Sequence, residues 1–218
     1  MPAAGACVSA AGERRVMHIS EGVLSAPVLA GGWVLAAAGT AIGLKRLDYD
    51  RLMTVAILAA AFFVASLVHV PIGPASVHLI LNGLLGVILG FAAFPAICVG
   101  LLLQAVLFQF GGLVVLGVNT VDMALPAVVC FLIFRPLLRA GGRARMIGAF
   151  CCGVLAVLLA GCLTALALAL SGEAFVATAK VIFLAHVPIM AIEGVLTALA
   201  VGFLAKVRPE MLQLRLAD

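Results

Sequence analysis

The residues most able to do chemistry lie in one short segment, Met17-His18-Ile19-Ser20-Glu21-Gly22. If translation starts at Met17, a free α-amine, the amide nitrogen of His18 and the His18 imidazole lie on one short piece of backbone. These three nitrogens can bind one face of a small metal ion. An α-amine has a pKa of about 8, so a metal can displace its proton close to neutral pH.

A fourth nitrogen is available from a histidine at the end of a proline- and glycine-rich connector, residues 71–78. Of the two histidines that flank this connector, we favour His78 over His69, because an irregular loop can fold inward against protein. A square of nitrogens suits nickel(II), copper(II) or cobalt, whereas calcium and magnesium prefer oxygen and zinc prefers a tetrahedron. We therefore expect Met17, His18 and His78 to hold a transition-metal ion.

Other polar residues are candidates for contacts around such an ion. A charge inside the hydrocarbon costs at least about 2.5–3.5 kcal/mol near a helix centre, so Glu193, within the last apolar run, needs an explanation. His186 lies two turns before Glu193, and the two residues either line the site or form a buried pair between helices. We also expect supporting contacts from a further set of polar residues: His69, Ser76, Asn82 and Asn119. For His69, an interfacial position at a helix end is the alternative.

The composition indicates what positions these residues. Of 218 residues, 66% are hydrophobic and 10% are charged, against about 25% charged in soluble domains. Apolar runs of about 20 residues recur, and each is long enough to cross a bilayer as a helix. They are too long and unalternating for barrel strands. The sequence therefore predicts an all-α polytopic membrane protein. The net charge of +4 does not indicate nucleic-acid binding, because the basic residues lie in short loops.

The apolar runs divide the chain into about seven expected transmembrane helices. Pro95 is interpreted as a break between two of them, and residues 111–122 and 171–180 as semi-polar connectors. The expected spans are 23–44, 52–70, 79–94, 96–110, 123–138, 146–170 and 181–205. Residues 1–16 are interpreted as a mis-called or disordered extension, 17–206 as the membrane metal-binding domain and 207–218 as a cytoplasmic tail.

The basic residues predict the orientation by the positive-inside rule. Ten of them fall on one side of the expected membrane, and only Lys180 falls on the other once residues 1–16 are set aside. This places Met17, the 71–78 connector and Asn119 outside, and the C-terminus in the cytoplasm. The ten are Lys45, Arg46, Arg51, Arg135, Arg139, Arg143, Arg145, Lys206, Arg208 and Arg215.

Four stretches, in order along the chain, resemble motifs of the CbiM/NikM proteins, the substrate-binding membrane subunits of energy-coupling-factor importers for cobalt and nickel. The segment at Met17 is similar to their MHI-x-EG start, and residues 66–78 with Asn82-Gly83 to their second motif. Residues 110–119 are similar to HGG-L-TTLG-x-N, and residues 192–197 to AEG-LLT. The similarity covers residues 17–206. Phe110 replaces the usual histidine, and Val114-Val115 replace the two threonines.

The resemblance implies a seven-helix fold in which the amine of Met17, His18 and His78 hold Co²⁺ or Ni²⁺ as transported substrate. It also implies partners: a transmembrane coupling subunit, ATPase subunits and a small accessory membrane protein. The chain contains no GxxxxGK[ST] sequence, so ATP hydrolysis would be supplied by those partners. We expect a non-enzymatic import subunit in a bacterial or archaeal cell (inner) membrane, serving cobalamin biosynthesis or nickel enzymes.

Two other functions remain open from the sequence. A stand-alone secondary transporter or channel would need charged residues near mid-membrane in several spans, and only Glu193 qualifies. A membrane enzyme would need convergent acids, bases or nucleophiles, and the four histidines are spread along the chain. Cobalt and nickel accept the same nitrogens, so the residues do not separate the two ions.

Overall fold

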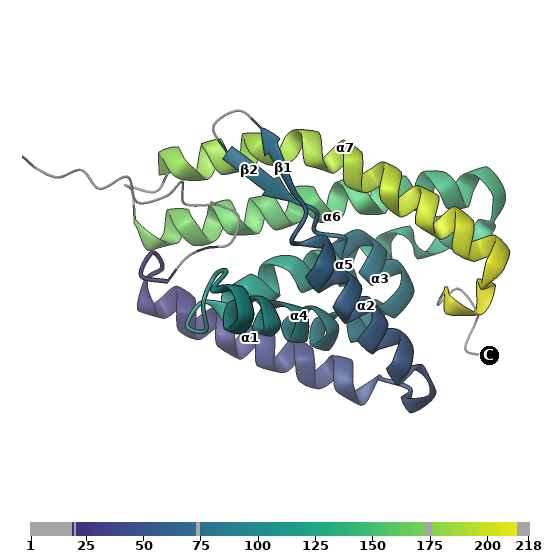
Figure 1. The fold of residues 1–218 in the computed structure, drawn as a ribbon, viewed down its shortest axis with the longest axis horizontal. Helices are drawn as coiled ribbons and strands as arrows, with labels where there is room; N and C mark the ends of the chain where they lie inside the picture. The colour runs from purple at the N-terminus through teal and green to yellow at the C-terminus, as the bar shows by residue number, and fades with distance from the viewer. Residues whose placement is uncertain (1–18, 20, 73–74, 173–175, 213–218) are drawn as a thin grey trace, which may run out of the picture.

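The computed structural model describes residues 19, 21–72, 75–172 and 176–212. Within these ranges the chain forms seven α-helices and one short hairpin (Figure 1). The elements are α1 (Ala26–Lys45), η1 (Tyr49–Arg51), α2 (Leu52–Ala65), β1 (His69–Ile72), β2 (Ala75–His78), α3 (Asn82–Leu89), η2 (Gly90–Ala92), α4 (Ala93–Phe108), α5 (Leu116–Ala140), α6 (Gly142–Ser171), α7 (Val176–Val207) and η4 (Pro209–Met211).

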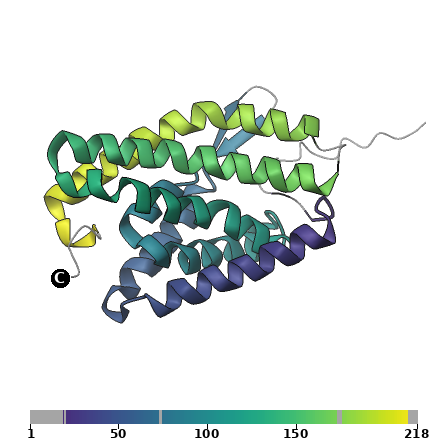
Figure 2. The same cartoon turned by 180° about the vertical axis from the view of Figure 1, so that it is seen from behind.

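The long helices α5, α6 and α7 lie side by side, and α1 runs along the opposite edge of the bundle (Figures 1 and 2). Glycines allow close approach between α1 and its neighbours. A Cβ on Gly117 of α5 would lie 2.8 Å from the Trp33 backbone, and one on Gly43 would lie 2.6 Å from the carbonyl oxygen of Phe91. Such small residues are typical of helix contacts in membranes, where close backbone packing drives association.

The expectation of a helical membrane protein is confirmed in its main feature. Among the described residues, five stretches have the length and composition of a bilayer crossing, and one of them, Asn82–Phe108, is divided at Gly90 into α3 and α4. The 14-residue α2 and the 8-residue α3 are each shorter than a full crossing. The five stretches are Ala26–Lys45, Asn82–Phe108, Leu116–Ala140, Gly142–Ser171 and His186–Val207.

Several expected boundaries were wrong. The connector before His78 is not an irregular loop: β1 and β2 pair antiparallel, and His69 is opposite His78 in the ladder. The helix break falls at Gly90 rather than Pro95, because Gly90 adopts φ +55° and ψ −123°, whereas a proline is tolerated in the first turn of α4. Helix α5 begins at Leu116 and α7 at Val176, so two segments expected as semi-polar connectors belong largely to helices.

Helix α3 is the buried centre of the bundle. Its first residue, Asn82, lies beside the backbone of Ala156, in the middle of α6. Its end lies near the α1–α2 connection, where the Arg51 guanidinium donates to the carbonyl of Ile88. The chain then reverses at Gly90, and α4 runs back until Phe108 meets Phe63 at the end of α2. The segment that follows the hairpin therefore enters the bundle beside the middle of α6.

Arg51 joins three parts of the chain at this end. One nitrogen, Nη2, donates to the carbonyl oxygens of Ile88 at 3.3 Å and Met211 at 2.8 Å. Burial lowers the pKa of Arg51 from its usual range, and the nearby Asp48 carboxylate offsets part of that shift. The guanidinium stays charged at physiological pH, so it holds η4 against α3 through charge-assisted hydrogen bonds.

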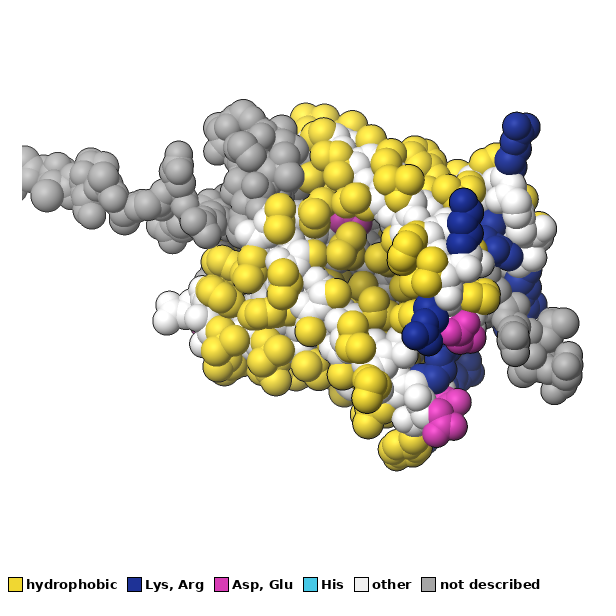
Figure 3. Space-filling model, turned by 45° about the vertical axis from the view of Figure 1, so that its right-hand side comes forward, with side chains coloured by type: hydrophobic (Ala, Val, Ile, Leu, Met, Phe, Trp, Pro, Cys, Tyr) yellow, Lys and Arg dark blue, Asp and Glu magenta, His cyan; other side chains and the backbone are white. Residues whose placement is uncertain are grey.

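Basic and hydrophobic side chains occupy different parts of the surface along the long axis. Lys and Arg side chains gather at one end of the molecule, and most of the remaining visible surface is hydrophobic (Figure 3). The helix ends at this pole are the last turns of α1, α5 and α7 and the first turn of α6 (Figure 1).

Candidate metal site

His78 closes strand β2, and its side chain is buried, with 1% of its surface exposed. The ring nitrogen Nδ1 lies 2.8 Å from the carbonyl oxygen of Leu79. Because a carbonyl oxygen only accepts hydrogen bonds, Nδ1 must carry the proton in this contact. In the neutral ring the lone pair is then on Nε2, the arrangement in which a histidine binds a metal while its other nitrogen is fixed by a hydrogen bond.

The loop after His78 is held by an acidic side chain of α7. The carboxylate of Glu193 accepts hydrogen bonds from the backbone N–H groups of Ile80 and Leu81, and the two Leu81 distances are 2.9 and 3.0 Å. Glu193 is fully buried. The position of Glu193 inside the last apolar run thus has an explanation: its carboxylate accepts the hydrogen bonds that the main chain after His78 donates.

The same loop contains a strained residue and a polar anchor. Leu81 has φ +52°, a left-handed conformation that costs a residue with a Cβ about 1–3 kcal/mol. Directly after it, the Asn82 side chain accepts from the N–H of Gly83 at 2.9 Å and donates to the carbonyls of Met123 and Ala156. These contacts, together with Glu193, fix the loop in spite of the strain. Asn82, a candidate for contacts near the ion, anchors the loop to α5 and α6 through these bonds.

The segment after His18 is held from a different side of the bundle. Ile19 is buried against a second hydrophobic cluster, which includes Val115 and Leu168. Its carbonyl oxygen accepts a long hydrogen bond from the Asn119 side chain, at 3.5 Å. Asn119 lies in the first turn of α5 and is itself buried. It therefore helps to position Ile19, the residue next to His18.

Glu21 makes a further contact with the start of α5. Its carboxylate accepts from the N–H of Val114 at 3.0 Å. Gly112, at φ +119°, lies so close to Glu21 that a Cβ there would overlap the carboxylate. The carbonyl oxygen of Val114 in turn accepts from the indole Nε1 of Trp33 in α1, at 3.0 Å. The backbone of Val114 thus links the N-terminal segment to two helices.

Two apolar residues in this region, Phe110 and Val115, contact other apolar side chains. Val115 is fully buried in the second cluster, and Phe110 stacks on Phe108 with ring centroids 5.8 Å apart.

Part of the expected site lies outside the described residues. This holds for Met17 and His18 altogether, and for the side chains of His69 and Ser76. Among the described residues no cluster of three His, Cys, Asp or Glu side chains is suitable for a metal. That result does not bear on the expected ligand set, which takes its other nitrogens from the start of the chain. His186 is buried in α7, within 3.6 Å of a Cβ placed on Gly161 of α6.

Two acidic residues with positioning roles were missed from the sequence. Glu21 was noted only as part of a motif, and Asp122 was interpreted as part of a connector. Asp122 is buried in α5, one turn after Asn119, and its carboxylate accepts from the hydroxyl of Thr164 at 3.2 Å. The i, i+3 spacing of Asn119 and Asp122 was the available signal, because it places both on one helix face.

Comparison with known proteins agrees with this arrangement. Residues 18–211 match CbiM, described as the cobalt uptake substrate-specific transmembrane region. A Haemophilus influenzae protein, provisionally named a metal transport protein, is 43% identical over 199 residues, which cover 90% of this chain and 97% of that protein. The cobalt transport protein CbiM of Sorangium cellulosum is 32% identical over 212 residues, covering 90% and 94% of the two chains.

Solved structures give the same result. A crystal structure of a transition metal transporter superposes with a TM-score of 0.76 at 27% identity, covering 88% of this chain and 93% of that one. A truncated transition metal transporter gives a TM-score of 0.73 at 25% identity, covering 89% and 99%.

The fold and these matches thus define a polytopic membrane protein of the metal-transport class. Within that class, the chain belongs to the CbiM family of cobalt and nickel transport proteins.

Proposed function

We propose that the chain captures Co²⁺ or Ni²⁺ with high affinity as the substrate-binding subunit of an energy-coupling-factor importer, and has no catalytic activity of its own. The observation that carries this proposal is the state of His78. Its ring is buried, Nδ1 donates to the Leu79 carbonyl, and the following loop is bonded to Glu193. A histidine ring held in this orientation can offer Nε2 to a metal without losing further side-chain freedom on binding.

The remaining ligands would come from the start of the chain, provided that translation begins at Met17. They are the α-amine of Met17 and the amide and imidazole nitrogens of His18. With Nε2 of His78 they give four nitrogens and no oxygen, which favours nickel or cobalt over magnesium and calcium. The anchoring of Ile19 by Asn119 and of Glu21 by Val114 fixes the described residues that follow His18 in the sequence. His69 and Ser76 remain candidates for contacts near the ion.

The proposed orientation has the metal-binding start outside and the C-terminus in the cytoplasm of a bacterial or archaeal cell membrane, with all seven helices within the bilayer. Its support is the clustering of Lys and Arg at the opposite pole (Figure 3). The imported ion would serve cobalamin biosynthesis or nickel enzymes.

Import would depend on partners. A transmembrane coupling subunit, ATPase subunits and a small accessory membrane protein are the proposed set. The support is indirect: one relative is a fused cobalt transport protein CbiMQ, and another is a fused nickel transport protein NikMN. Such fusions join a region similar to this chain with additional sequence in one polypeptide.

Release of a tightly held ion would require the ligands to separate. The histidine loop is bonded to Glu193 of α7, whereas the N-terminal segment is bonded to Asn119 of α5 and to the connector before it. A partner-driven tilt that moves α7 relative to the start of α5 would therefore pull His78 away from His18. If cells lacking the ATPase subunits imported metal at the same rate, this coupling would be wrong.

The direct test uses the protein with a verified N-terminus. Intact mass establishes whether the chain begins at Met17, and isothermal titration with Co²⁺ and Ni²⁺ in competition measures affinity. Three extra glycines before Met17 should abolish tight binding, because the chelating amine becomes a peptide nitrogen and the new α-amine lies too far along the chain from His18. His78→Ala should weaken binding strongly, while Glu210→Gln, an exposed carboxylate at the opposite end of the molecule, should leave binding unchanged. Retained tight binding in both the extended chain and His78→Ala would reject the proposed site.

A stand-alone transporter or channel is the second candidate. The buried Asp122 adds one acidic group to Glu193 in favour of it. However, the Glu193 carboxylate is engaged by main-chain N–H groups, which favours an anchoring role. Metal uptake into proteoliposomes that contain this chain alone would support the second candidate over the first.

A further inference from the structure

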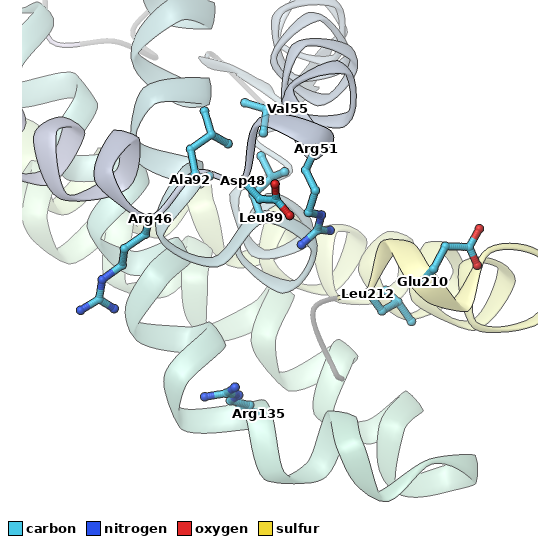
Figure 4. Close-up of a pocket in the computed structure, with 10 residues that line it drawn as sticks. Arg46, Asp48, Arg51, Val55, Leu89, Ala92, Arg135, Glu210 and Leu212 are labelled. Atoms are coloured by element: carbon cyan, nitrogen blue, oxygen red, sulfur yellow. The ribbon is translucent and has the colours of Figure 1, made fainter. Parts of the chain in front are cut away.

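A cavity of about 430 Å³ opens at the basic pole of the bundle, away from the histidine loop. It lies where α1 ends and α2 begins, and it also contacts the last residue of α3 and the chain segment around η4 (Figure 4). Its size falls in the range of small-molecule sites, roughly 300–1,000 Å³, and exceeds what one side-chain carboxylate would fill. The lining residues are Arg46, Leu47, Asp48, Arg51, Val55, Leu89, Ala92, Arg135, Glu210 and Leu212.

Three arginines from three different elements surround the cavity. The Arg46 guanidinium is stacked 4.0 Å from the centre of the Phe91 ring. Arg51 uses Nη2 for the carbonyls of Ile88 and Met211. Arg135 has a buried Nε atom without a hydrogen-bond acceptor among the described residues. Donors held in this way are suited to an anion with several oxygen atoms, since guanidinium groups bind phosphate with paired hydrogen bonds.

The two carboxylates that line the cavity, from Asp48 and Glu210, do not cancel its positive charge. Glu210 is exposed and pairs with Arg208 at 3.5 Å, and in Figure 4 its carboxylate points away from the three arginines. Asp48 lies beside Arg51, and its Oδ1 atom accepts from the N–H of Asp50 at 3.1 Å. The lining thus has three guanidinium groups and two carboxylates, of which only Asp48 lies beside an arginine of the cavity, so the balance of charge at the cavity is positive.

The other half of the lining is apolar, from Leu47, Val55, Leu89, Ala92 and Leu212. Just outside, the ends of α1 and α2 expose large hydrophobic side chains, with Leu44 at 55% and Met53 at 75%. An occupant with an anionic head and apolar chains would match both parts. Basic pockets between helix ends at the membrane surface are suited to lipid head groups.

We propose that this cavity binds the phosphate group of a membrane phospholipid, with Arg46, Arg51 and Arg135 as hydrogen-bond donors and with the acyl chains lying along α1 and α2. The occupant would touch Arg51, which joins η4 to the end of α3. Lipid binding should therefore stabilise the packing of the C-terminal segment as well as the cavity.

The test uses the full chain, delipidated in detergent. Native mass spectrometry counts retained lipids, and thermal unfolding measures stabilisation. The probes are phosphatidylglycerol, phosphatidylethanolamine, diacylglycerol with the same chains, and glycerol 1-phosphate. The variant is Arg46→Gln/Arg135→Gln, which spares the structural contacts of Arg51. The matched control is Lys45→Gln/Arg143→Gln, which removes the same charge from exposed positions at the same pole that do not line the cavity.

We expect both phospholipids to be retained and to raise the unfolding temperature, and diacylglycerol to do neither. Retention should fall about tenfold in the cavity variant and stay unchanged in the control. Equal retention in the two variants, or equal effects of diacylglycerol, would overturn the proposal. Equal stabilisation by glycerol 1-phosphate would assign the cavity to a soluble phosphate compound instead. Loss of a co-purifying partner subunit without any change in lipid retention would assign it to a protein contact.

Discussion

The backbone N–H of Leu81 lies 2.9 and 3.0 Å from the two carboxylate oxygens of Glu193, although 112 positions separate the residues in the sequence. This contact places a carboxyl group of α7 against the main chain directly after His78. It holds a residue at positive φ and leaves the buried carboxylate satisfied. In a low-dielectric interior, these hydrogen bonds are electrostatically stronger than they would be in water.

Replacing Glu193 by Gln should loosen this loop. The amide keeps one acceptor, but it brings an NH₂ group against backbone donors and loses charge assistance. We expect a loss of about 1.5–3 kcal/mol in the free energy of unfolding, and metal affinity reduced at least about tenfold with all proposed ligands still present. Denaturant unfolding and metal titration measure the two effects.

The control for that variant is Glu210→Gln, an exposed carboxylate at the opposite pole. It should change stability by less than about 0.5 kcal/mol and leave metal binding intact. Identical metal affinities for Glu193→Gln and the unmodified protein would show that the loop does not depend on this carboxylate.

Replacing Asn119 by Ala should release the segment that follows His18. The lost hydrogen bond to the Ile19 carbonyl is long, so we expect a modest cost of about 0.5–1.5 kcal/mol. Metal affinity should fall by up to about tenfold, and backbone amides of residues 21–24 should exchange hydrogen faster. Thr120→Ser, one position along the same helix, keeps these contacts and should leave exchange unchanged. Unaltered exchange in Asn119→Ala would mean that the cluster around Ile19 alone positions the segment.

Adding a methyl group at Gly83 should disrupt the centre of the bundle. A Cβ there would lie 2.7 Å from the Cα atom of Gly153 in α6, where backbone meets backbone and neither can yield easily. We expect Gly83→Ala to cost about 1–3 kcal/mol in the free energy of unfolding. Gly31→Ala in α1 is the matched control, because a Cβ there meets nothing within 4 Å. It should be neutral or stabilise by up to about 1 kcal/mol. Similar unfolding curves for the two variants would contradict the close packing of α3 on α6.

Metal binding should release protons and weaken as the pH falls. The proposed α-amine ligand has an ordinary pKa of about 8, and it must be deprotonated to bind. Protons therefore compete with the metal more strongly at pH 6 than at pH 8. Titration calorimetry in two buffers of different ionisation enthalpy gives the number of protons released. The protein with three extra glycines before Met17 lacks an α-amine next to His18 and should show a flatter pH dependence. A metal affinity that stays the same between pH 6 and pH 8 would exclude the Met17 amine as a ligand.

The sequence predicted the helices because long apolar runs carry that information by themselves. It did not predict where polar residues enter a helix. Asn119 and Asp122 interrupt the hydrophobic pattern at the start of α5, and tertiary contacts to Ile19 and Thr164 are what satisfy them. Likewise, Pro95 was the obvious breaker by residue type, but a proline in a first helical turn costs little, and the backbone reversal needed Gly90.

For the candidate site, His78 could be selected from its place in a Pro/Gly-rich stretch beside a helix start. The role of Glu193 could be suspected from the cost of burying a charge. Its partners could not be named, because backbone N–H groups carry no residue-type signature in the sequence. The hairpin pairing of β1 with β2 was missed for a related reason: Pro71 and the glycine beside the turn indicate irregular backbone when no partner strand is known.

The single tryptophan of the chain occupies an informative position. Trp33 donates its indole N–H to the same residue, Val114, whose own N–H is held by Glu21. An indole that is 45% exposed and hydrogen-bonded at this point is sensitive to the polarity of its surroundings. The protein therefore carries a built-in fluorophore one residue away from the carboxylate that fastens its N-terminal segment, and emission from unlabelled protein would report, in real time, whether that segment is docked.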